Sequence, residues 1–97
     1  MAYADLVAED RRLSILLLLD ASPGGIGNEA LLQAALPSFG HAPSADTVRA
    51  DLAWLAEGRL ITTRDTQGLV VATLAERGAD VAAGRAVHPG VKKRRPG

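Results

Sequence analysis

The sequence predicts a mainly helical α+β domain that contains one small β-hairpin. Apolar residues recur three and four positions apart in three segments before Gly58, as the buried face of a helix requires. After Gly58 the pattern changes to two short runs rich in β-branched residues, 60–64 and 69–73, which are separated by turn residues. The chain has 97 residues, of which 47% are hydrophobic, and this is enough for one domain with a core of its own.

The first predicted helix, about residues 4–20, is apolar over most of its circumference near its end. Such a helix is either central to the core or shared with a partner chain, because a small domain would otherwise expose one apolar side to water. We expect a homodimer. Four leucines share one face of the helix, and the expected interface consists of three apolar residues on its other faces: Ile15, Leu18 and Leu19.

The loop 21–27, ASPGGIG, leads into a short second helix at 29–36, which Asn28 is suited to cap. The glycines of this loop are not those of a phosphate-binding loop. That motif needs a preceding strand and a Lys-Ser/Thr pair, and here a helix precedes the loop and no lysine occurs before Lys92. We interpret the segment as a helix connector.

The third helix follows a turn at 41–45, is capped by Ser44 and runs to about Glu57. Its inward stripe places Asp51 beside the buried face, where we expect it to pair with a basic side chain. Trp54 is either a core-edge residue packed on the first helix, which we favour, or a dimer contact. The stripe consists of Val48, Leu52 and Leu55.

A fourth helix is predicted at 74–84, where Thr73 and Glu76 have the spacing of a capping box and Gly78 weakens the helix. Residues 1–84 would then form the domain. The remaining segment, 85–97, is rich in Pro, Gly and basic residues with few apolar anchors, so we expect an extended, basic and mobile tail.

Three helices, a two-stranded hairpin and a short C-terminal helix are the element order of a winged helix-turn-helix domain. The run TVRADLAWLAEGRLITT (47–63) resembles the junction between recognition helix and wing in bacterial regulators of the ArsR and MarR type. In those proteins a glycine often stands directly before the leucine, whereas here Arg59 lies between Gly58 and Leu60. The chain also resembles the short winged-helix proteins of Mu-like phages and prophages, through NEALLQAAL, ATLAERGADVAAGR and HPGV.

This resemblance implies binding of double-stranded DNA as a small phage-type transcriptional regulator, with the third helix in the major groove and the wing on the flanking backbone. Arg49 would contact a guanine edge or a phosphate, and Arg64 would contact a phosphate or the minor groove from the wing. The tail would add salt-dependent affinity as a basic arm. The full set of expected contacts is Ser44, Thr47, Arg49, Ala50, Arg64, Thr66, Lys92, Lys93, Arg94 and Arg95.

The charge distribution argues against this function and leaves an alternative open. Four of the eleven Lys and Arg residues lie at 92–95, so residues 1–91 hold seven basic and eleven acidic side chains, a net charge of −4. DNA-binding domains are more often basic throughout, because neutralised phosphates supply most of the non-specific affinity. The alternative is a winged-helix module that binds another protein and not DNA.

Other functions find little support in the sequence. The chain has no cysteine and its two histidines lack neighbouring ligands, so we expect no metal and no other cofactor. No nucleophile lies near a base at a catalytic spacing, and we do not expect an enzyme. The longest apolar run, 15–19, is too short to cross a membrane and no signal peptide is evident, so we expect a cytoplasmic protein without a membrane partner.

Overall fold

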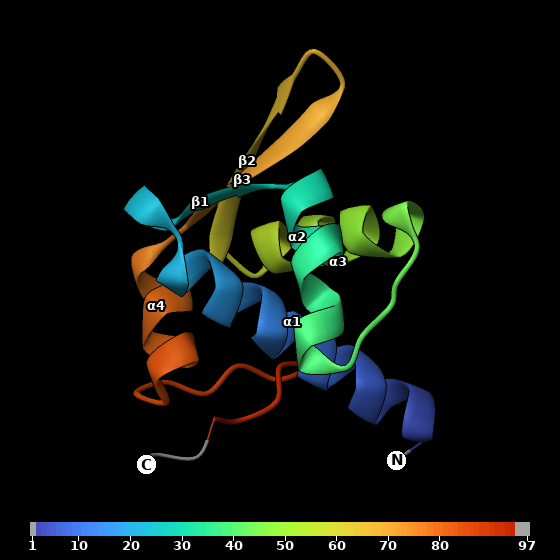
Figure 1. Cartoon of the computed structure of the whole chain (residues 1–97). Helices are drawn as coiled ribbons and strands as arrows, with labels where there is room; N and C mark the ends of the chain where they lie inside the picture. The colour runs from blue at the N-terminus through green and yellow to red at the C-terminus, as the bar shows by residue number, and fades with distance from the viewer. Residues whose placement is uncertain (1, 95–97) are drawn as a thin grey trace.

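The computed structural model describes residues 2–94, which form an α+β arrangement of four α-helices and a three-stranded antiparallel sheet (Figure 1). The fold class expected from the sequence is confirmed at this level. In chain order the elements are α1 (Tyr3–Ala21), η1 (Pro23–Gly25), β1 (Ile26–Asn28), α2 (Glu29–Ala35), η2 (Leu36–Phe39), α3 (Ala45–Glu57), β2 (Ile61–Thr66), β3 (Leu69–Leu74) and α4 (Glu76–Ala83), where η denotes a 3₁₀-helix.

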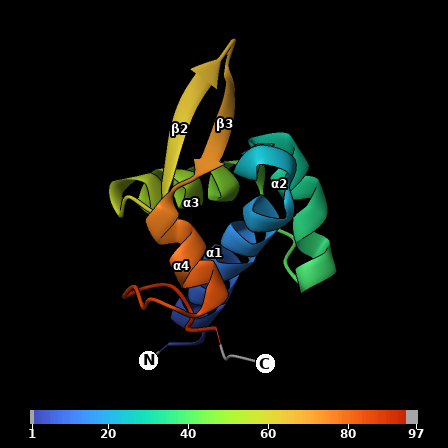
Figure 2. The ribbon, with the colours of Figure 1, turned by 90° about the vertical axis from the view of Figure 1, so that its left-hand side faces the viewer.

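The sheet has the order β1-β3-β2, and its β2–β3 hairpin projects away from the helices (Figures 1 and 2). The hairpin is the one predicted from the sequence, with Ile61 paired to Leu74 and Thr66 to Leu69. Strand β1 was not predicted, because three residues are too few to show alternation. Gly27 is buried there, and a Cβ at this position would lie 3.1 Å from Leu19 Cδ2. The loop predicted as a helix connector therefore also supplies an edge strand.

Helix α1 runs through the centre of the molecule, where it contacts α4, β3, η2 and α2. Ile15 and Leu19 are fully buried within the single chain. Their expected place in a dimer interface is therefore wrong, because neighbouring elements of the same chain already cover these faces of the helix. Leu18 is partly buried and packs against the same core.

The segment after α4 does not extend from the domain, in contrast to the expected mobile tail. Residues 85–94 fold back along α1, where the Lys92 amide donates to Glu9 O (3.1 Å) and Arg12 Nη1 donates to Gly90 O (2.8 Å). Val91 is buried in the core and anchors the segment. We call residues 85–94 the strap. The folded unit therefore continues past the boundary predicted at residue 84.

A buried ion pair joins α1 to α3. Asp51 is 4% exposed and accepts two hydrogen bonds from Arg11, one from Nε and one of 3.0 Å from Nη2. The guanidinium of Arg12 lies 4.1 Å from the ring centroid of Trp54, and its Nε is 3.9 Å from Asp51. These contacts confirm that Asp51 pairs with a basic side chain and that Trp54 packs at the core edge against the first helix.

The chain turns sharply between α3 and β2. Gly58 keeps a helical φ of −76°, and Arg59 adopts the left-handed conformation with φ of 61°. After a helix, the residue in this conformation is usually glycine. Arg59 therefore occupies the left-handed position, directly before Leu60, at which the ArsR- and MarR-type pattern has its glycine.

Helix α4 packs closely on this turn through Gly78. A Cβ at Gly78 would overlap the carbonyl oxygen of Leu60 and would lie 2.8 Å from Leu74 Cδ1. The sequence interpretation of Gly78 as merely a weak helix residue is therefore incomplete. The predicted capping box is wrong, because Thr73 belongs to β3 and Ala75 occupies the N-cap without a side-chain hydrogen bond.

Gly78→Ala tests this close approach. Helix propensity alone would stabilise the variant by about 1 kcal/mol, because alanine is the better helix former. We expect the opposite sign, a loss of about 2 kcal/mol or more, because the methyl group displaces α4 from Leu60. Urea unfolding of both proteins measures the difference, and an increase in the free energy of unfolding would contradict the packing described here.

Asp51→Asn tests the buried ion pair. The amide keeps the shape of the side chain but leaves the guanidinium of Arg11, only 15% exposed, without a counter-charge. We expect the free energy of unfolding to fall by about 3 kcal/mol. Asp80→Asn is the matched control, since Asp80 pairs with Arg85 on the surface, and it should cost less than about 1 kcal/mol. Equal losses in the two variants would exclude a special role for Asp51.

Candidate nucleic-acid interface

The outward face of α3 carries small or polar side chains. Ala50 and Ala53 are exposed, and Asp46 and Arg49 flank them. The helix begins as predicted at Ser44, whose Oγ accepts the amide of Thr47 at 3.1 Å. The Ser44 hydroxyl also donates to Thr47 Oγ1 at 3.0 Å, so these two residues form one cap at the exposed end of the helix.

The β2–β3 hairpin is exposed from residue 62 to residue 69. Its two-residue turn has positive φ at both Gln67 and Gly68, which is the geometry of a type I′ turn. Asp65 Oδ1 accepts the amide of Gly68 at 2.7 Å and so closes the turn. Strand alternation places Arg64 and Thr66 on the hairpin face opposite to the buried Ile61. The hairpin thus presents polar side chains on both faces.

Arg49 does not point freely into solvent, because Glu29 at the start of α2 holds it. Arg49 donates from Nε to Glu29 Oε1 (3.1 Å) and from Nη2 to Glu29 Oε2 (2.9 Å). Nη2 also donates to the carbonyl oxygen of Gly68 at 2.9 Å, and the amide of Val70 donates to Glu29 Oε2. We call these contacts the Glu29–Arg49 clamp. It joins α2, α3 and the hairpin into one surface.

Both side chains of the clamp are ionised at neutral pH. The hydrogen bonds from Arg49 and, after them, the Val70 amide lower the pKa of the Glu29 carboxyl. The bonds to Glu29 raise the pKa of Arg49, with smaller contributions from the charges of Asp65 and Asp46. Three carboxylates, those of Glu29, Asp65 and Asp46, therefore act on Arg49.

The structure brings together only part of the expected contact set. Ser44, Thr47, Arg49 and Ala50 share the outward side of α3, and the hairpin turn reaches Arg49 through Gly68 O. Arg64 and Thr66 lie on the hairpin face opposite to the buried Ile61, so only their strand is brought near α3. The cations of the C-terminal segment do not join them. In Figures 1 and 2 the strap lies at the opposite end of the molecule from the hairpin. There Lys92 pairs with Asp10 (3.3 Å), and Arg94 donates to Ala82 O (3.1 Å).

Lys93 follows Lys92 on the exposed side of the strap, while Arg95 lies outside the described residues. Glu29 was not recognised in the sequence as part of the site. Its only signal is an acidic residue in the first turn of a helix, and its partner is 20 positions away in the chain.

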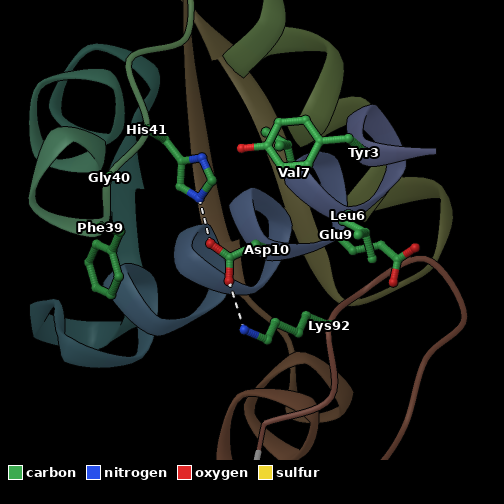
Figure 3. A pocket seen from close by; sticks show the side chains of 9 residues that line it. All are labelled: Tyr3, Leu6, Val7, Glu9, Asp10, Phe39, Gly40, His41 and Lys92. Carbon is green, nitrogen blue, oxygen red and sulfur yellow. Dashed lines mark hydrogen bonds and ion pairs between the residues drawn. The ribbon is translucent and has the colours of Figure 1, made fainter. Parts of the chain in front are cut away.

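A second exposed feature is an open groove of about 510 Å³ at the end of the molecule opposite the hairpin (Figure 3). Its apolar walls include Tyr3, Leu6 and Phe39, which are 81%, 50% and 40% exposed. At its polar side His41 Nε2 lies 2.7 Å from Asp10 Oδ2. Burial opposes ionisation of Asp10, but its bonds with His41 and Lys92 outweigh this effect and lower its pKa.

No helix within residues 2–94 combines the length and the apolar character that a membrane span requires.

Comparison with known proteins shows that the chain is similar to a phage protein and to a bacterial protein. It is 47% identical over 93 residues to the uncharacterized protein gp26 of Escherichia phage Mu, with 95% of both chains covered. It is 36% identical over 78 residues to an uncharacterized protein of Haemophilus influenzae, covering 79% of this chain and 76% of that protein. No protein-family model and no solved structure matches the chain. The chain therefore belongs to the family of gp26 of phage Mu.

Proposed function

We propose that this chain is a winged-helix protein that binds double-stranded DNA as a small phage transcriptional regulator. The observation that carries the proposal is the outward face of α3, with exposed alanines beside a projecting polar hairpin. Small side chains let a helix approach base edges closely, and a hairpin rich in threonine offers hydroxyl donors to phosphate. Helix α3 would enter the major groove, and β2–β3 would contact the flanking backbone.

The number of cations on this surface determines how strongly DNA binding should depend on salt. Arg49 and Arg64 are the cations that the described part of α3 and the hairpin offer to phosphate. Each neutralised phosphate contributes about −0.9 to the slope of log K against log salt concentration. Binding should therefore be weak and have a slope no steeper than about −2 for each bound copy. A strongly basic domain would give a much steeper dependence.

Fluorescence anisotropy with a mixed-sequence duplex at low salt tests the assigned contacts. We expect Arg49→Ala and Arg64→Ala each to weaken binding by about tenfold, because each loses a charge-assisted hydrogen bond to DNA. The matched control is Lys92→Ala with Lys93→Ala, which removes two charges at the opposite end and should leave the affinity unchanged.

Two results would refute these assignments. One is an absence of binding by the wild-type chain at low salt. The other is a loss confined to the Lys92 and Lys93 variant, since this would place DNA at the strap instead of α3.

A homodimer is the second part of the proposal. With Ile15 and Leu19 buried, the groove around Tyr3 and Leu6 is the apolar surface best suited to a second copy. Two grooves related by a twofold axis would bring the exposed Tyr3, Leu6 and Phe39 of one copy against those of the other. A dimer would also double the cations that are offered to one DNA site.

Leu6→Asp tests the dimer, because Leu6 is half exposed and its change should leave the fold intact. We expect the wild-type chain to sediment as a dimer at micromolar concentration and the variant as a monomer. Leu31→Asp is the matched control, since Leu31 is 64% exposed on α2 outside the groove, and it should remain dimeric.

The same groove favours the second candidate function, a protein-interaction module without DNA binding. A monomeric wild-type chain would contradict the dimer and leave a different protein as the occupant of the groove. Together with failed DNA titrations, that result would favour the interaction module.

A further inference from the structure

The clamp uses the donors of Arg49 unevenly. A guanidinium has five N–H groups on three nitrogens. Nε gives its single hydrogen to Glu29, and Nη2 gives one to Glu29 and one to the carbonyl of Gly68. Within residues 2–94 no acceptor is assigned to Nη1. In the free chain, therefore, only one of the three nitrogens can donate to DNA.

This allocation limits what Arg49 can recognise. Bidentate recognition of guanine or of a phosphate requires donors on two adjacent nitrogens, either Nε with Nη2 or Nη1 with Nη2. Both pairs include Nη2, whose two hydrogens are already used. Arg49 in the clamp can therefore donate only from Nη1, and two-point contact through adjacent nitrogens requires the clamp to open.

Glu29 is held in place independently of Arg49. Its Oε2 also accepts the amide of Val70, and the side chain belongs to the first turn of α2, where a negative charge is stabilised by the helix dipole. The side chain is 12% exposed, so water competes weakly for its oxygens. When Arg49 leaves, a fixed carboxylate remains at the DNA-facing surface.

We propose that Glu29 is an autoinhibitory counter-charge, which holds Arg49 in an intramolecular ion pair and limits its contact with DNA to Nη1. The inference rests on the proposed DNA binding and concerns the regulation of that site. It makes Glu29 a positioning residue, which acts on DNA through Arg49. Affinity in the free chain is thereby kept low, and a change that neutralises Glu29 releases one additional phosphate contact.

Salt titrations with a generic duplex test the inference with five proteins: the wild type, Glu29→Gln, Arg49→Ala, the double variant and Asp46→Asn. Glutamine keeps an acceptor for the Val70 amide but removes the charge that holds Arg49. We expect E29Q to bind more tightly than the wild type, with a slope steeper by about 0.9. Its advantage should fall about 3.5-fold between 50 and 200 mM salt, as one additional phosphate contact requires.

The gain should disappear in the double variant, because it acts through Arg49. Asp46→Asn is the matched control, since it removes an acid near Arg49 without releasing the clamp. Any gain from D46N should leave the slope unchanged. If E29Q fails to fold, Arg49→Lys replaces it, because lysine keeps the charge but cannot form the two-point clamp, and it should also bind more tightly than the wild type.

Different results overturn different statements. Wild-type binding with no gain in E29Q, or in R49K where that replaces it, overturns the autoinhibitory role and leaves DNA binding standing. A gain that persists in the double variant also overturns it, since Glu29 would then act only as a repelling charge. Absence of binding by all five proteins overturns the proposed function and the inference together.

Discussion

The arrangement of α3 on the rest of the molecule depends on the buried pair between Asp51 and Arg11. A buried carboxylate needs cationic partners, and here α1 supplies Arg11, which donates two hydrogen bonds to Asp51, and Arg12, whose Nε lies 3.9 Å from it. Together with the buried stripe of Val48, Leu52 and Leu55, the pair fixes which side of α3 faces inward. It therefore also determines that Arg49, Ala50 and Ala53 face outward, so the candidate interface follows from a contact on the opposite side of the same helix.

The same pair explains how an acidic helix is compatible with a proposed DNA-binding role. Asp51 is directed into the protein, and Glu57 lies at the end of α3 away from the Ser44 cap. Of the acids on α3 itself, only Asp46 stands near Arg49. The remaining negative charge of the surface comes from Glu29 on α2 and Asp65 in the hairpin. The charge around Arg49 therefore depends mainly on contacts between α2, α3 and the hairpin, and less on the composition of α3.

Much of this architecture is predictable from the sequence. Spacing predicts the three main helices and the hairpin, the Asn28 and Ser44 caps form as expected, and Asp51 pairs as its helix position indicates. Strand β1 escapes prediction because three residues carry no periodic signal. The strap is not predictable from composition, because two tertiary contacts hold it. Val91 is buried in the core, and Gly90 packs so closely on Trp54 that a Cβ would lie 2.7 Å from Cη2. Both features arise from tertiary contacts.

The candidate site is predictable only in part, because tertiary packing also decides which charges surround it. A helix projection finds Arg49 and Ala50 on one face, but it cannot find Glu29, which reaches Arg49 only after α2 and α3 pack together. Nor can it place the basic residues 92–94, because the folded strap takes them away from the hairpin. Local pattern specifies which side chains face outward, and long-range packing determines their charge environment.

A map of amide chemical-shift changes, recorded as a short mixed-sequence duplex is added to the wild-type chain at low salt, tests DNA recognition most directly. We expect changes concentrated at 44–53 and 62–70, including the amides of Gly68 and Val70 beside the clamp. Changes centred instead on Tyr3, Leu6 and Phe39, or no changes at all, would contradict DNA recognition through α3 and the hairpin.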